Sequence, residues 1–116
     1  MSHSHETNFP PDLWGPGMWF TLHAAALRYP ARPSVADKNH MYGFITNLQY
    51  VLPCTGCCVG MGKILEMTTF GAKDLASSDA LFAWTVTAHS IVNEKTGKPA
   101  RNDWQKWKKS YLALSV

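Results

Sequence analysis

Apolar residues recur every three or four positions along most of this chain, which is the spacing of helices that bury one face. Between Gly17 and Arg28 one such face is formed by Trp19, Leu22, His23 and Ala26. Two prolines in the segment 29–33 stop the pattern, because proline restricts its own backbone and that of the preceding residue. We therefore predict a first helix over residues 17–28.

The next two helices are separated by a single proline. Ser34 is a predicted N-cap, with Asp37 as its capping-box partner, for a helix that extends to Leu52. Pro53 breaks this helix and suits the first turn of the next one. The third helix is predicted over residues 54–68.

The rest of the chain predicts one long and one short helix. A loop over 71–78 ends in two serines that can cap a fourth helix, and Gly97 and Pro99 end that helix. Asn102 or Asp103 can cap a short last helix with several aromatic residues. No stretch alternates as a strand does, so the predicted fold class is all-α: a four-helix bundle with a short fifth helix.

Composition agrees with one folded domain. The chain has 116 residues, of which 46% are hydrophobic and 16% charged, and this excludes a disordered protein. We predict a flexible N-terminal tail over residues 1–11 and a single domain over 12–116. No segment has the apolar run of a signal peptide or a membrane span, so we predict a cytoplasmic protein that does not bind membranes. A net charge of +3 does not by itself indicate a nucleic-acid partner.

All three cysteines lie within five positions, as Cys54, Cys57 and Cys58. The first two form a C-x-x-C at the predicted start of the third helix. The unpaired N–H groups there favour a thiolate, and the two-residue spacing lets a disulfide open and close. Cys58 points to another face of the helix and is predicted to be buried and inert. The pair is typical of a redox switch.

Zinc binding is the main alternative for the cysteine pair. Zinc takes four ligands, and His40 or His89 could join Cys54 and Cys57, but neither histidine has a partner at ligand spacing. A thioredoxin-like fold is excluded, because there the C-x-x-C follows a strand.

A redox pair needs an electron acceptor, and two residue pairs indicate where it binds. Trp19 and His23 are four apart on one helix, as are His89 and Asn93 on another. Bundle cores commonly hold cofactors. The basic segment 94–109, with its tryptophans, suits either a nucleotide or single-stranded nucleic acid. A non-enzymatic zinc or nucleic-acid module therefore remains the alternative function.

Three blocks of sequence together resemble the Erv/ALR-type FAD-linked sulfhydryl oxidases, and in particular their compact virus-encoded members. They read WGPGMWFTLHAAALRYPARP, LPCTGC and LFAWTVTAHSIVNEKTGKP. The resemblance implies a small helical bundle with FAD bound at one end. It also implies oxidation of protein dithiols, with electrons passing through FAD to O₂ and H₂O₂ released.

The resemblance also assigns roles to residues. It implies that Cys54 exchanges with the substrate and that Cys57 lies against the flavin. Because the ligand spacing for zinc is incomplete, we predict no metal site. The other implied cofactor-binding residues are Trp14, Gly15, Trp19, His23, Tyr29, His89, Asn93, Lys98 and Trp107.

The sequence departs from the family pattern in three places. Ser90 stands where the family has asparagine, and we expect it to lose a hydrogen bond without loss of cofactor binding. The positions of a common structural disulfide are Val86 and Asp103, so packing must supply that stability. A second cysteine pair is absent, so we predict that a protein dithiol or thioredoxin-like partner reaches Cys54 directly. The family also implies a homodimer.

Overall fold

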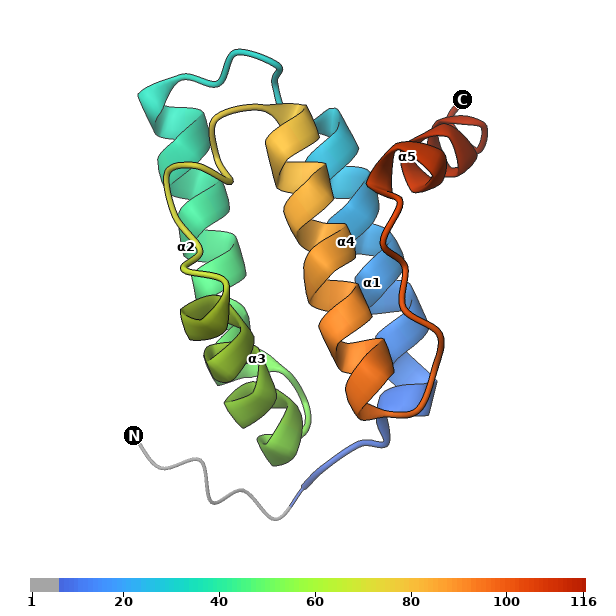
Figure 1. Cartoon of the computed structure of the whole chain (residues 1–116). Helices are drawn as coiled ribbons and strands as arrows, with labels where there is room; N and C mark the ends of the chain where they lie inside the picture. The colour runs from blue at the N-terminus through green and yellow to red at the C-terminus, as the bar shows by residue number, and fades with distance from the viewer. Residues whose placement is uncertain (1–6) are drawn as a thin grey trace.

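The computed structural model describes residues 7–116, which form five helices and no strand. The helices are α1 Pro11–Arg28, α2 Val35–Val51, α3 Thr55–Met67, α4 Ser78–Lys95 and α5 Trp104–Leu112. The first four alternate in direction, with α1 packed against α4 and α2 against α3 (Figure 1). The short α5 packs against α4 and α1. The predicted all-α bundle with a short fifth helix is confirmed.

Side-chain caps place the helix starts where the sequence predicts them. The N–H of Asp37 donates to Ser34 Oγ at 3.1 Å and the N–H of Ser34 donates to Asp37 Oδ2 at 2.9 Å, which completes the predicted capping box. Ser77 accepts a hydrogen bond from the backbone of α4, and Asp103 accepts one from the backbone of α5. Each cap satisfies a backbone donor that the helix itself leaves unpaired.

The first helix begins six residues before its predicted start, at Pro11. Proline suits the first helical position, but Pro16 within the helix and the glycines around it hide the helical pattern in the sequence. Residues 1–6 of the predicted tail lie outside the described part of the chain. The N–H of Phe9 donates to the carbonyl of Pro53 at 2.8 Å, and Trp14 Nε1 donates to the carbonyl of Phe9 at 2.9 Å. Phe9 and Pro11, which belong to the predicted tail, are therefore hydrogen-bonded to Pro53 and part of α1, respectively.

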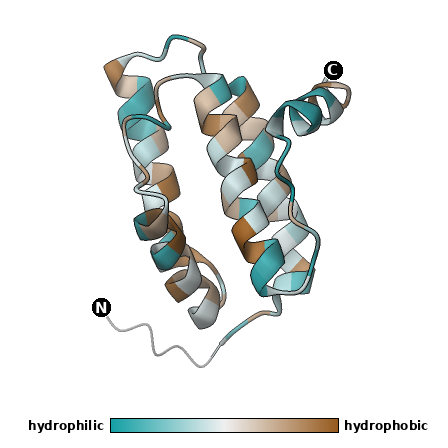
Figure 2. Ribbon diagram, viewed as in Figure 1, coloured by the Kyte–Doolittle hydropathy of each residue, from teal (hydrophilic) through white to brown (hydrophobic). Residues whose placement is uncertain are grey.

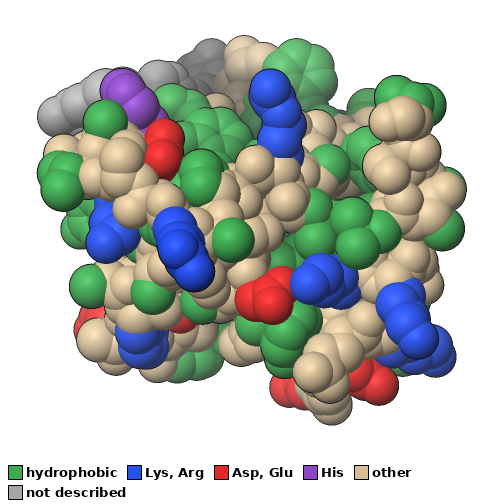
Figure 3. Space-filling model, turned by 90° about the horizontal axis from the view of Figure 1, so that it is seen from above, with side chains coloured by type: hydrophobic (Ala, Val, Ile, Leu, Met, Phe, Trp, Pro, Cys, Tyr) green, Lys and Arg blue, Asp and Glu red, His purple; other side chains and the backbone are tan. Residues whose placement is uncertain are grey.

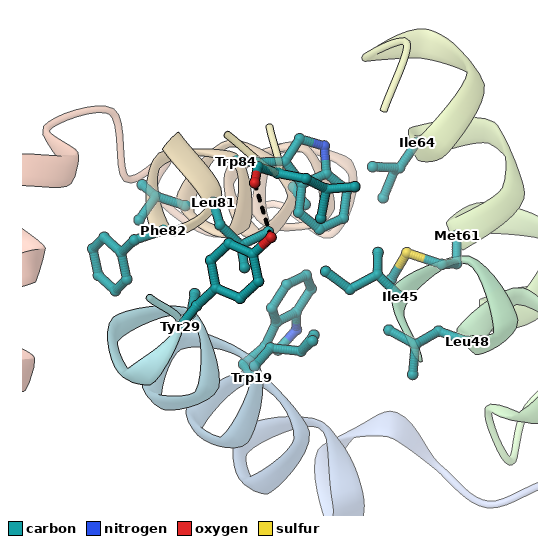
Figure 4. Close-up of a cluster of buried hydrophobic side chains, with 14 residues drawn as sticks. Trp19, Tyr29, Ile45, Leu48, Met61, Ile64, Leu81, Phe82 and Trp84 are labelled. Carbon is teal, nitrogen blue, oxygen red and sulfur yellow. Dashed lines mark hydrogen bonds between the residues drawn. The ribbon is translucent and has the colours of Figure 1, made fainter. Parts of the chain in front are cut away.

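The hydrophobic core lies between the two helix pairs, and its side chains come from all four long helices (Figure 4). Trp19 of α1, Ile45 of α2, Ile64 of α3 and Trp84 of α4 point towards one another there (Figure 4). The fully buried Phe82 of α4 lies on the other side, where its ring contacts those of His23 and Tyr111. The hydroxyl of Tyr29 donates to the carbonyl of Leu75 at 2.8 Å, as the dashed line in Figure 4 shows. This bond ties the loop between α3 and α4 to the end of α1.

The segment between α4 and α5 is held to α4 by a hydrogen-bonded pair. Ser90 Oγ donates to the carbonyl of Arg101 at 2.6 Å and accepts from the N–H of Arg101 at 2.8 Å. α5 is largely hydrophilic (Figure 2) and is attached through partly buried aromatic side chains. Val86 and Asp103, which stand where the family pattern has a structural disulfide, lie in the same two segments. Ser90 therefore makes two hydrogen bonds that link the segments without a covalent bond.

Ser90→Ala should lower the free energy of unfolding by about 1–3 kcal/mol, because the backbone groups of Arg101 lose their buried partner. The measurement is the urea midpoint followed by far-ultraviolet circular dichroism. Ser110→Ala is the control, since that exposed serine bonds only to its own helix and its loss should cost less than about 0.5 kcal/mol. Equal midpoints for the two variants would contradict a stabilising role for Ser90.

Candidate active site at the start of the third helix

The cysteine pair lies at the N-terminus of α3, as predicted. Cys54 is the N-cap, and its Sγ accepts a hydrogen bond from the N–H of Cys57 at 3.3 Å. Both are free, half-buried thiols. Cys58 is buried, as predicted, and donates its S–H to the carbonyl of Leu52 at 3.2 Å. Two sulfurs one helical turn apart, with access from outside, can form a reversible disulfide.

The two partners of the pair differ in their surroundings. Partial burial, followed by the hydrogen bond with Cys54 and the neighbouring thiols, raises the pKa of Cys57 to about 12. The raised pKa disfavours a thiolate at Cys57, because desolvation outweighs the lowering by the backbone hydrogen bond at the helix N-terminus. A positive charge or a hydrogen-bond donor beside this sulfur would favour its thiolate.

A cavity of about 350 Å³ lies beside Cys57, at the end of the bundle where α1 and α3 begin and α4 ends. Trp14 and Trp19 contribute flat aromatic walls, and most of the remaining surface is aliphatic. The volume lies within the range of small-molecule sites, roughly 300–1,000 Å³. The cavity suits a flat, largely apolar group that touches a thiol.

Glycines leave the space in this cavity open. Gly15, Gly56 and Gly60 all line it, and a Cβ built on any of them would meet no atom within 4 Å. Lys63 and Lys95 also line the cavity and could pair with anionic groups of a ligand. A flavin ring system and an attached phosphate therefore fit the residues that are present.

A second cavity, of about 160 Å³, lies on another side of the cysteine pair. It is lined by Thr7, Asn8, Tyr50, Val51, Leu52, Pro53, Cys54, Thr55 and Cys58. Cys54 lines both cavities, whereas Cys57 lines only the larger one. Cys54 is thus the sulfur that a group outside the larger cavity can reach.

Two histidines form a hydrogen-bonded cluster between α1 and α4. His23 Nδ1 lies 2.9 Å from Thr85 Oγ1, and His23 Nε2 lies 3.0 Å from His89 Nδ1. The ring of His89 stacks on that of Trp19 with centroids 4.3 Å apart and 1° between the planes. Trp19 therefore connects the histidine cluster to the larger cavity.

Both histidines are held neutral. Burial, followed by repulsion from His89 and Arg101, lowers the pKa of His23 to about 3. Burial, followed by repulsion from Arg101 and Lys98, lowers the pKa of His89 to about 4. The unfolded chain therefore binds more protons than the folded chain between about pH 4 and pH 6.5.

The cofactor-free protein should lose stability as the pH falls from 6.5 towards 4, because protonation of the histidines then favours the unfolded chain. The loss reaches up to about 1.4 kcal/mol per pH unit for the fully buried His23 and less for the half-buried His89. Urea midpoints measured between pH 7 and pH 4.5 test this. His40→Gln, at an exposed position on α2, should keep the same pH dependence. A midpoint that does not fall on acidification would contradict neutral histidines.

The structure brings together only some of the residues that the resemblance implies. Trp14, Gly15, Trp19, Cys54 and Cys57 all line the larger cavity. His23 and His89 lie behind Trp19 and do not line it.

The remaining four implied residues have structural contacts elsewhere. Tyr29 is bonded to the α3–α4 loop. Asn93 Nδ2 donates to the carbonyl of Pro99 at 3.1 Å, and the N–H of Lys98 donates to the carbonyl of Asn93 at 2.7 Å. The guanidinium carbon of Arg101 lies 4.2 Å from the ring centroid of Trp107. None of these four lines the larger cavity.

Sequence reasoning missed much of the lining. The missed residues are Pro11, Met18, Leu52, Gly56, Gly60, Met61, Lys63, Ile64, Met67, Ile91, Val92, Lys95 and Thr96. Helical spacing could have found many of them. Gly60, Met61 and Ile64 follow Cys57 by three, four and seven positions, which is one face of α3.

The alternative functions gain no support from the geometry. The described residues 7–116 contain no group of three or more His, Cys, Asp or Glu side chains placed to hold a metal ion. On the face seen in Figure 3, Lys and Arg side chains are distributed among hydrophobic and acidic ones rather than forming a continuous basic stripe. Within the same residues, no helix has the length and hydrophobicity needed to cross a bilayer.

The sequence model of the Erv1 / Alr family matches residues 16–112 of this chain. The chain is 38% identical over 88 residues to a probable FAD-linked sulfhydryl oxidase of Acanthamoeba polyphaga mimivirus, covering 76% of this chain and 62% of the relative. It is 34% identical over 104 residues to the mitochondrial FAD-linked sulfhydryl oxidase ERV1 of Saccharomyces cerevisiae, covering 85% of this chain and 53% of the relative. The chain thus spans less than two thirds of these relatives.

The same similarity is seen in three dimensions. The crystal structure of the FAD binding domain of Erv1 from Saccharomyces cerevisiae superposes with a TM-score of 0.80 at 29% identity. The match covers 90% of this chain and 95% of that one. The helices and their order are therefore those of the solved domain.

Proposed function

This chain belongs to the Erv1 / Alr family, and we propose that it is an FAD-linked sulfhydryl oxidase, which converts protein dithiols to disulfides. One observation carries the proposal. A C-x-x-C at a helix start lines a cavity that two tryptophans also line, and of the two cysteines Cys54 alone also lines the second cavity. The names of the relatives support the same activity.

The chemistry of the cysteines follows from this geometry. In the oxidised enzyme a substrate thiolate attacks Sγ of Cys54, forms a mixed disulfide and breaks the Cys54–Cys57 bond. The sulfur of Cys57 takes the electron pair of the broken bond. A second substrate thiolate then attacks the substrate sulfur of the mixed disulfide, which releases Cys54 and completes the substrate disulfide.

Bound FAD would supply the redox chemistry, accepting the electron pair from the reduced cysteine pair and passing it to O₂ to give H₂O₂. Trp14, Gly15 and Trp19 would hold the flat ring system against Cys57, and apolar side chains would keep water from it. Lys63 and Lys95 are placed to pair with phosphate oxygens. Roles for His23, Tyr29, His89, Asn93, Lys98 and Trp107 in cofactor binding remain predictions.

The visible absorption spectrum of the purified protein tests the proposal. A flavin band should bleach when a dithiol is added without air and should return when air is admitted. A colourless protein that takes up no added FAD would contradict the proposal. If a flavin band is present but a dithiol does not bleach it, the protein binds FAD and the proposed electron path through Cys54 and Cys57 is wrong.

The proposal extends to the substrate, the oligomeric state and the cellular location of the protein. We expect a protein dithiol, or a thioredoxin-like partner, to reach Cys54 directly, and we expect a homodimer. Sedimentation velocity checks the assembly. A cytosolic location, where stable disulfides need a dedicated catalyst, stays a prediction, since the yeast relatives are named as mitochondrial.

A further inference from the structure

A chain of hydrogen bonds between α4 and α1 has a single direction. The hydroxyl of Thr85 lies 2.6 Å from the carbonyl of Phe82, which can only accept, so Thr85 donates to it. A hydroxyl has one proton. In its other short contact, 2.9 Å from Nδ1 of His23, the Thr85 oxygen therefore accepts. His23 must carry a proton on Nδ1.

The direction passes from His23 to His89. His23 is neutral, so with its proton on Nδ1 its Nε2 is an acceptor. The 3.0 Å contact between His23 Nε2 and His89 Nδ1 is then a hydrogen bond donated by His89. His89 is also neutral, so its Nε2 has a lone pair and no proton. Both rings have the same tautomer.

We propose that Thr85 is a positioning residue, whose hydroxyl fixes the tautomers of His23 and His89. His89 Nε2, on the ring that stacks on the cavity-lining Trp19, is thereby kept as a hydrogen-bond acceptor. The link to the cofactor rests on the proposed function. His89 is half-buried and does not line the larger cavity, so the donor that its Nε2 meets would be an amino or hydroxyl group of FAD that extends beyond that cavity. The assignment of the tautomers does not depend on FAD.

Loss of the Thr85 hydroxyl should reverse the direction of the hydrogen bond between His23 and His89. Thr85 is fully buried and His23 is 1% exposed, so water cannot replace the hydroxyl. A buried N–H without a partner is rarer in proteins than a buried acceptor without one. In Thr85→Val the proton of His23 should therefore move to Nε2 and bond to Nδ1 of His89. His89 must then carry its proton on Nε2, where it becomes a donor.

Two-bond ¹H–¹⁵N correlation spectra of the cofactor-free protein near pH 7 test the tautomers directly. In the wild type and in Thr85→Ser both rings should be protonated on Nδ1 alone, and in Thr85→Val on Nε2 alone. The exposed His40 serves as an internal reference. A wild-type His89 with its proton on Nε2, or with both nitrogens protonated, would overturn the proposal even if Thr85→Val did not fold.

FAD titration tests the link to the cofactor. Thr85→Val should weaken FAD binding by about tenfold, the value of one hydrogen bond, and Thr85→Ser should restore it. If Thr85→Val reverses the tautomers and binds FAD as tightly as the wild type, the acceptor role is wrong and the oxidase proposal stands. If the wild type binds no FAD, both the oxidase proposal and the acceptor role fail, while the tautomer result stands.

Discussion

Cys57→Ser should lower the rate of dithiol oxidation by about 10³-fold or more, while the flavin band remains. A serine hydroxyl cannot form the disulfide with Cys54 or pass on an electron pair. Serine is only slightly smaller than cysteine, so the shape of the cavity beside it should stay the same. Oxygen consumption with a small dithiol gives the rate, and the ratio of flavin to protein absorption gives the occupancy.

Two further variants make this result specific. Cys54→Ser should show the same loss, because the attacked sulfur is missing. Cys58→Ser should keep the rate within about threefold, because serine can replace the hydrogen bond from this buried thiol to Leu52. Full turnover in either C-x-x-C variant would reject the roles given to the pair.

Gly15→Leu should weaken FAD binding by about 10- to 100-fold, since forcing a side chain and the cofactor into the same volume costs about 1–3 kcal/mol. Gly15 is buried and lines the cavity, and a Cβ there would point into open space. The cofactor-free protein should keep or gain stability, because glycine within a helix costs about 1 kcal/mol relative to alanine. Fluorescence titration with FAD and thermal unfolding measure the two effects.

Gly17→Leu is the matched control for this variant. Gly17 lies on the same helix, is exposed, does not line the cavity and also has space around its Cβ position. The same helix-stabilising change should therefore leave FAD binding unaltered. Equal affinities for Gly15→Leu and the wild type would show that this cavity is not the FAD site.

The sequence predicts the helices well where local chemistry decides their ends. Ser34 with Asp37 forms the expected capping box, and the helix break at Pro53 places Cys54 at a helix start. The sequence does not predict the start of α1, because glycine and proline there lower the helix propensity. Hydrogen bonds of Phe9 and Trp14, which the hydrophobic pattern does not reveal, hold this end of the helix in place.

The site was predicted less completely, because a motif gives the identity of residues and not the side of the helix on which a cavity opens. The resemblance pointed to Lys98, whereas Lys95 lines the cavity and Lys98 follows the end of α4. Tyr29 has its hydroxyl bonded to a loop outside the cavity. The raised pKa of Cys57 depends on burial between helices, which no local spacing reveals.

The pair formed by Ser90 and Arg101 has a consequence for how the protein responds to its surroundings. The link between α4 and the segment before α5 is made of hydrogen bonds, which reducing agents do not break. The three cysteines of the chain all lie at the start of α3. An added reductant can therefore reduce the Cys54–Cys57 pair without breaking the link between Ser90 and Arg101. The attachment of the segment before α5 is thus expected to be insensitive to the redox reaction proposed for the cysteines.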